Sequence, residues 1–197
     1  MKTKIIYIIF LLFTSSSISY AQGSNKIFQK AGWLLVNGHL PGDNSSYNVG
    51  ALGLNYGLRY NLASFGDNIS FGIESEFSPA VSFFSNDEFS LMLDIPLMAG
   101  INIGAGSTYD TDNDHGFGLA FGLNSFIAPV FKEADQKFYI NPVVQFCLRS
   151  FNANSTALRE LGVRVGFGNH PEVIVSDGIL DGPIISIAFT WSKYIGY

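Results

Sequence analysis

The residues with the clearest chemical pattern are three alternating aspartates, Asp110, Asp112 and Asp114, in the stretch DTDNDHG. Alternating carboxylates also open the calcium-binding loop D-x-D-x-D-G. Here His115 stands where that loop needs glycine, and the twelfth position is Phe121 instead of glutamate. Aspartate, asparagine and glycine are favoured in hairpin connections in any case. We therefore predict a solvated turn, and the three aspartates are only a weak metal candidate.

A second group consists of six charged residues that alternate with bulky apolar ones along the chain. Three are positive and three are negative, so opposite charges can pair. Such a set would suit a proton or ion path, or a balanced structural network, and we favour the network. The six are Arg59, Glu74, Glu76, Asp94, Arg149 and Arg164.

Eight alternating segments, divided by turn-forming clusters, must position these groups. One face of each segment is bulky and apolar, and the other carries mainly Gly, Ala, Ser and Asn besides the six charges. The first segment alternates poorly, and its facing stays open. Pro96 suggests a bulge or a misplaced boundary, and Pro142 suggests a position near a rim. The expected segments are 30–38, 48–62, 69–77, 89–105, 117–127, 138–149, 161–168 and 185–197.

The composition indicates which face meets lipid. Charged residues make up 14% of the 197 residues, against roughly a quarter in ordinary soluble domains. A cation facing lipid costs about 2–4 kcal/mol at the bilayer midplane, and among the assigned strands only Lys193 lies on the bulky face. With no water in the bilayer, every backbone group must be paired, so the sheet has to close. We predict an all-β fold, an eight-stranded antiparallel up-and-down transmembrane β-barrel.

The amino terminus has the pattern of a cleavable signal peptide. Lys2 and Lys4 precede the apolar run Ile5 to Phe13, and Ser19-Tyr20-Ala21 places small residues before the expected cleavage site. The expected domains are therefore the signal peptide, residues 1–21, and the barrel, residues 22–197. Removing the two lysines takes the net charge from −5 to −7, which argues against nucleic acid as a partner.

The signal peptide, the eight segments and the aromatic end of the last one resemble the small outer-membrane β-barrels of Gram-negative bacteria, the OmpA/OmpX-like group. The resemblance implies location in the outer membrane, contact with its lipids, and a structural, adhesive or surface-interaction role. Eight strands leave an interior filled by side chains. The resemblance also implies that the last strand is the signal read by the barrel-assembly machinery, through Phe189, Trp191, Ile195 and Tyr197.

Other functions remain as alternatives: a barrel that handles lipids or small ligands, and a membrane-embedded lipid hydrolase. Barrel lipid A deacylases use a His-x-Ser pair, which none of His39, His115 and His170 forms. Cys147 is expected to be a small packed residue instead of a nucleophile. We therefore expect no enzymatic activity, no catalytic residue and no cofactor. The apolar loop 169–183 is a candidate surface for an unknown partner, although capping of the barrel mouth is favoured.

Overall fold

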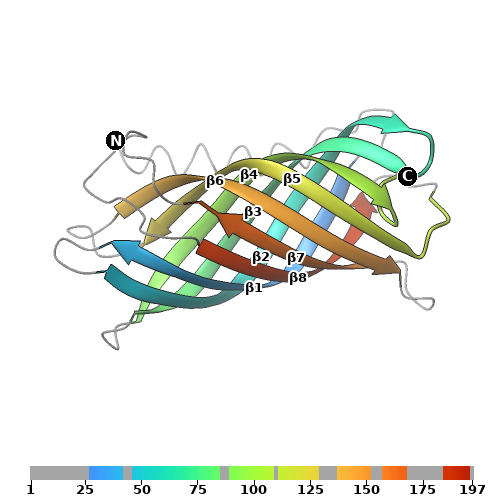
Figure 1. The fold of residues 1–197 in the computed structure, drawn as a ribbon. Helices are drawn as coiled ribbons and strands as arrows, with labels where there is room; N and C mark the ends of the chain where they lie inside the picture. The colour runs from blue at the N-terminus through green and yellow to red at the C-terminus, as the bar shows by residue number, and fades with distance from the viewer. Residues whose placement is uncertain are drawn as a thin grey trace.

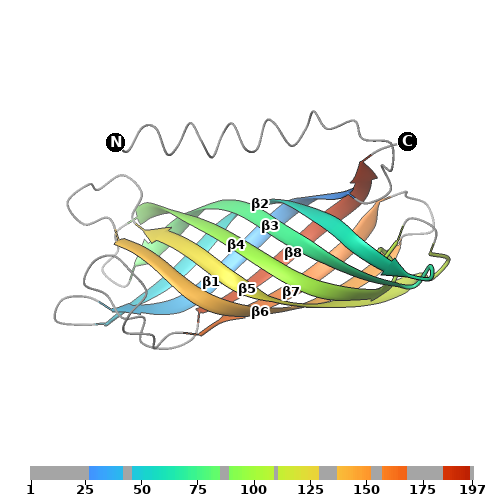
Figure 2. The same ribbon diagram turned by 90° about the horizontal axis from the view of Figure 1, so that it is seen from above.

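A computed structural model describes residues 27–41, 46–84, 89–108, 111–128, 137–151, 157–167 and 184–195. Each strand pairs antiparallel with its neighbour in the chain, and β8 pairs with β1 to close a barrel (Figures 1 and 2). The expected signal peptide, residues 1–21, lies outside the described residues. The strands are β1 (Ile27–Pro41), β2 (Ser46–Phe65), β3 (Ile69–Phe84), β4 (Phe89–Gly104), β5 (His115–Ala128), β6 (Lys137–Phe151), β7 (Leu158–Gly166) and β8 (Ile184–Ile195).

The register fixes the tilt of the strands. Following paired residues once around the barrel leads from Ile27 back to β1 at Asn37, a stagger of ten residues. Eight strands with this stagger are tilted by roughly 40° from the barrel axis, given the usual strand spacing and rise. The steps after Ile27 are Tyr60, Ile73, Ala99, Phe121, Val144, Val165, Ile185 and Asn37.

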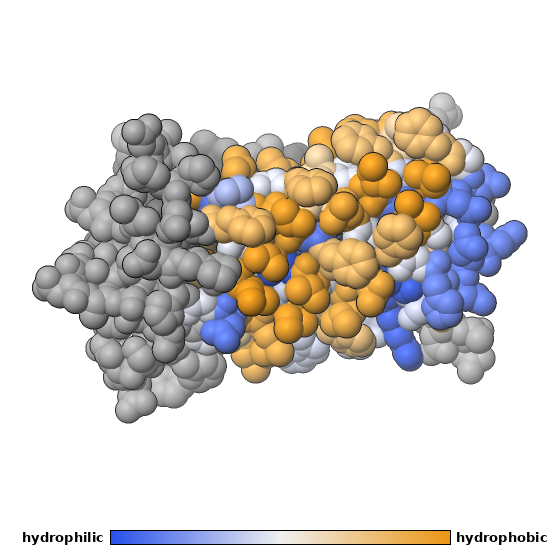
Figure 3. Space-filling view, in the orientation of Figure 1, coloured by the Kyte–Doolittle hydropathy of each residue, from blue (hydrophilic) through white to orange (hydrophobic). Residues whose placement is uncertain are grey.

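The strands are apolar outside and largely polar inside, the reverse of a soluble barrel. Large hydrophobic side chains of all eight strands are exposed, including Trp33, Leu54, Ile101 and Phe189. Figure 3 shows them as a broad band across the strands, with hydrophilic residues gathered at the right-hand end. This is the distribution of a transmembrane barrel, in which the outer face lies in acyl chains. In the described part of the chain, no helix is long and apolar enough to span a bilayer.

The strands extend beyond several expected boundaries. The expected third strand ended at residue 77, but β3 runs to Phe84 because Pro79 does not end it. The expected seventh strand began at residue 161, whereas β7 begins at Leu158, which adds Arg159 and Glu160. The expected last strand ran to residue 197, and the described β8 ends at Ile195. The facing of β1 is also settled, since Lys30 and Leu34 point inward and Trp33 points outward.

Pro96 does not mark a bulge or a strand boundary. The β3–β4 ladder pairs Ser75 with Leu97 and then Ser78 with Asp94, in an unchanged register. Two intervening residue pairs are missing because proline has no backbone N–H to donate. Pro142 lies where pairing with β7 ends, and its carbonyl accepts the bond from Phe167 N at 2.9 Å. The barrel therefore tolerates each proline at a local break in one ladder.

Candidate functional site

The inside of the barrel holds a balanced set of charges. All six charged residues expected to face inward are buried, and the structure adds Lys30 and Glu160. The described lumen therefore contains four cations and four carboxylates. They come from β1, β2, β3, β4, β6 and β7, so the closed sheet is what brings them together.

Lys30 is the centre of this ionic network. Its side chain is fully buried. The ammonium nitrogen lies 2.7 Å from Glu160 Oε1, 2.8 Å from Glu74 Oε1 and 3.3 Å from Glu76 Oε1. The three carboxylates belong to β3 and β7 and reach the lysine from different sides of the lumen. One cation thus holds three carboxylates that would otherwise repel one another in a site without solvent.

Arg164 extends the network toward β4. Its guanidinium donates to Asp94 Oδ2 at 2.6 Å and also pairs with Glu76. Its Nε donates to Gln145 Oε1 at 3.0 Å, and Gln145 Nε2 donates to Glu74 Oε1 at 2.6 Å. Paired, hydrogen-bonded ions are the only form in which so many charges are tolerated in a buried site.

The other two arginines lie nearer the end at which β1 begins and β8 ends, which we call the terminal rim. Arg149 pairs with Glu160 through its Nε. Arg59 donates to Asn102 Oδ1 at 3.2 Å and to the carbonyl of Gly106, and its guanidinium stacks 3.9 Å from the centre of the Phe28 ring. Arg59 is therefore tied both to the wall of the lumen and to the turn that follows β4.

That turn, residues 105–108, fills the lumen at the terminal rim. Gly104 and Gly106 both have φ of +71°, which lets the chain turn back into the barrel. Ala105 and Ser107 are fully buried there. Asn61 Nδ2 donates to the carbonyl of Ser107 at 2.7 Å. The turn lies between the expected fourth strand, which ended at residue 105, and the expected solvated turn at 110–116, and it closes the lumen on the terminal-rim side of the ionic network.

The opposite end, which we call the distal rim, carries an apolar layer inside the barrel. Its members lie near the strand ends on that side, as Ile184 opens β8 and Met92 is the fourth residue of β4. Their side chains contact one another across the lumen and separate the charges from the distal rim. The layer comprises Leu34, Val36, Ala51, Ala80, Met92, Phe126, Ile184 and Ala188.

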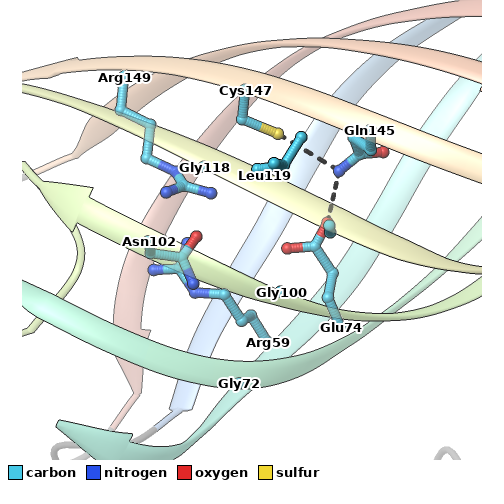
Figure 4. Close-up of a pocket in the computed structure, with 11 residues that line it drawn as sticks. Arg59, Gly72, Glu74, Gly100, Asn102, Gly118, Leu119, Gln145, Cys147 and Arg149 are labelled. Carbon is cyan, nitrogen blue, oxygen red and sulfur yellow. Dashed lines mark hydrogen bonds between the residues drawn. The ribbon is translucent and has the colours of Figure 1, made fainter.

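Between Arg59 and Arg149 lies a small cavity, shown in Figure 4. The neighbouring wall is made of Gly72, Gly100 and Ala120, which face one another in the register of β3, β4 and β5. The space open to the centre of a water molecule is about 10 Å³, roughly what one water needs. Among the described residues, Arg149 Nη1 is buried without a hydrogen-bond partner. The cavity therefore suits one water molecule, not an organic ligand.

Of the remaining sequence candidates, Cys147 lies in the lumen, where it lines the small cavity, and the other described ones do not join this site. Asp112 and Asp114 are exposed, and Asp110 lies outside the described residues. Within the described ranges, no group of three or more histidine, cysteine, aspartate or glutamate side chains could hold a metal. Cys147 is buried beside Gln145, whose Nε2 lies 3.3 Å from the sulfur. The loop 169–183, with His170, also lies outside the description.

The residues of the expected assembly signal lie on the outer face. Phe189 and Trp191 are 41% and 43% exposed, and their rings meet edge to face with centroids 4.9 Å apart. Ile195 is exposed at the end of β8, and Tyr197 lies outside the described residues. These side chains point away from the network, toward the surroundings of the barrel.

The fold and the network together define a closed eight-stranded barrel of the transmembrane type. No protein-family model and no curated protein significantly matches the chain. Among solved structures, the outer membrane protein OprG of Pseudomonas aeruginosa is similar, with 11% identity, a TM-score of 0.47, and coverage of 87% of this chain and 97% of that one.

Two further solved structures are similar in outline. Neisserial surface protein A has 9% identity and a TM-score of 0.49, over 86% of this chain and 97% of its own. The translocator domain of the autotransporter NalP from Neisseria meningitidis has 10% identity and a TM-score of 0.34, over 98% of this chain and 96% of its own.

Proposed function

We propose that this chain is an integral outer-membrane barrel of a Gram-negative bacterium with a structural, adhesive or surface-interaction role. The observation that carries this proposal is the reversed polarity of the barrel, apolar outside and ionic inside. Every strand exposes large hydrophobic residues, such as Trp33, Leu54 and Leu97. Their exposure to water would be unfavourable. Acyl chains accept them, and the closed sheet pairs the backbone groups of the strands.

The lumen is closed to solutes. Three features support this: the turn 105–108 at the terminal rim, the ionic network in the middle, and the apolar layer toward the distal rim. The cavity beside Arg149 has room for about one water molecule. We expect no stepwise conductance when the folded barrel is inserted into a planar bilayer, and porin-like steps would contradict a closed lumen.

The barrel is not an enzyme in this proposal. The buried ionic groups bond to one another. Within the described residues, neither Cys147 nor the outward-facing His115 is part of a nucleophile–base pair. During assembly of the barrel, the last strand would be recognised by the assembly machinery through Phe189, Trp191, Ile195 and Tyr197. In that role the exposure of the first three on the outer face of β8 makes them accessible to a partner.

Gel mobility with and without boiling tests the membrane-barrel proposal. A closed barrel resists dodecyl sulfate until it is heated, so the unboiled protein should migrate apart from the boiled one. A sample unfolded in urea before loading is the control and should show only the boiled mobility. The same protein should float with phospholipid vesicles in a density gradient. A protein that shows one mobility and stays in the aqueous fraction would overturn the proposal.

A further inference from the structure

Two cations lie on the otherwise apolar outer face, close to the terminal rim. Arg159 is the second residue of β7, and Lys193 is two residues before the end of β8; both are exposed. The next outward residues along these strands, Leu161 on β7 and Trp191 on β8, are exposed and apolar or aromatic. The cations therefore mark the edge of the apolar band on this side.

The register brings the two cations together. Arg159 is paired with Trp191, and Lys193 follows Trp191 by two residues on the same face. Arg159 and Lys193 are thus diagonal neighbours across β7 and β8, at a Cα separation of roughly 7–8 Å. Lys193 is also paired with Gln29 of β1, which adds a polar amide next to the ammonium. Long side chains in this arrangement can approach one anion from two sides.

Nothing in the described part of the chain neutralises these cations. Their side chains have no ion pair with a described acidic residue, in contrast to Lys30, Arg149 and Arg164 of the network. Elsewhere at the same rim the described strand ends carry apolar outward residues, among them Phe65, Ile69 and Phe117, and the exposed charged residues are the carboxylates Asp67, Asp112 and Asp114. The positive charge is therefore confined to the face formed by β7 and β8.

We propose that Arg159 and Lys193, each a neighbour of Trp191, bind the phosphate of an anionic phospholipid. Cations are costly at the bilayer midplane but reach the headgroup region by extending along the barrel wall. A guanidinium matches phosphate in shape and charge, and tryptophan is favoured at the same depth because its ring is amphipathic. The acyl chains of the bound lipid would cover Leu161 and Phe189. This site rests on the proposed membrane location.

The two tryptophans of the chain, Trp33 and Trp191, allow a direct test. Trp33→Phe leaves Trp191 as a reporter beside the cations, and Trp191→Phe leaves Trp33 as a reporter in the middle of the band. Each protein is folded into equimolar phosphatidylglycerol and phosphatidylcholine vesicles in which only one of the two lipids carries brominated chains. Bromine quenches the indole that it contacts.

We expect the Trp191 reporter to be quenched more by brominated phosphatidylglycerol, with a relative association constant of at least about five, because each of the two cations near an anionic surface contributes roughly 1 kcal/mol and one alone gives that ratio. Arg159→Gln with Lys193→Gln should bring that ratio to about one, whereas Arg159→Lys with Lys193→Arg, which keeps both charges, should preserve it. The Trp33 reporter should be quenched equally by both lipids in every variant.

The outcomes separate the two proposals. Equal quenching of Trp191 by both lipids in the protein with intact cations, with Trp33 quenched normally, would overturn the phosphate site alone. A preference that persists after both glutamine substitutions, in a barrel whose Trp33 reporter is still quenched, would also overturn it. Absence of quenching at both tryptophans would overturn the membrane location, and the site with it.

Discussion

Lys30→Met removes the cation at the centre of the network and tests whether these ions hold the barrel together. Methionine fills a similar volume but leaves Glu74, Glu76 and Glu160 close together, without the ammonium that lies 2.7–3.3 Å from each. Removing one partner of a buried ion pair costs about 3–5 kcal/mol, because the other charge stays buried without compensation. We expect a loss of that size in the free energy of unfolding.

Urea unfolding in neutral detergent micelles, followed by tryptophan fluorescence, measures this loss. Lys193→Met is the matched control, since it makes the same chemical change on the exposed face and should shift the free energy by less than about 1 kcal/mol. A second variant, Lys30→Met with Glu74→Gln, restores the charge balance and keeps an oxygen to accept from Gln145. It should recover about 1–3 kcal/mol relative to the sum of the single changes.

The stabilising role of Lys30 fails if the free energy of unfolding of Lys30→Met lies within about 1 kcal/mol of that of Lys193→Met. Such a result would mean that water or a rearranged arginine compensates the three carboxylates. It fails equally if the double variant is no more stable than the two single effects predict, because the charge balance would then not matter.

Three further predictions concern other parts of the barrel. Gly122→Ala should destabilise it by about 1–3 kcal/mol, since the added Cβ would meet the Leu97 carbonyl oxygen, whereas Gly162→Ala, with Cys147 Sγ at 3.6 Å, should change the urea midpoint little; equal effects would contradict this packing. Cys147 should resist a maleimide in the folded barrel and react fully in urea, as read by mass spectrometry, because it is buried; rapid labelling of folded protein would place it outside the lumen. Asp112→Asn with Asp114→Asn should leave the melting temperature unchanged with and without calcium, since both carboxylates are exposed; a calcium-dependent rise lost in this variant would restore the metal site.

The alternation of residues was enough to predict the class of fold, because it persists wherever the lumen is polar. On β2, Arg59 points inward and Tyr60 outward, and the sequence shows this directly. On β1 the signal fails, since Leu34 faces the internal apolar layer and Leu35 faces outward. Because both faces are apolar there, the period-two alternation disappears. The sequence therefore could not predict that Lys30 faces inward.

Two other features depend on contacts between distant segments. Glu160 and Arg159 were missed because β7 begins three residues before its clear alternation, at a position where Leu158 faces inward. That the turn 105–108 enters the lumen was not predicted, because its residues lie between the expected strand 89–105 and the expected solvated turn 110–116 and are typical of a hairpin connection. Only the bonds from Arg59 and Asn61 on β2 reveal that it enters the lumen.

The position of Lys30 has a consequence for how the chain reaches its final form. Lys30 sits on the first strand and Glu160 on the seventh, 130 residues later. An open sheet of β1 to β6, formed before the barrel closes, would contain an ammonium and several carboxylates that lack the ion-pair partners of the closed barrel. Partly folded barrels are therefore destabilised, and the pairing of the first strand with the last should form in one cooperative step.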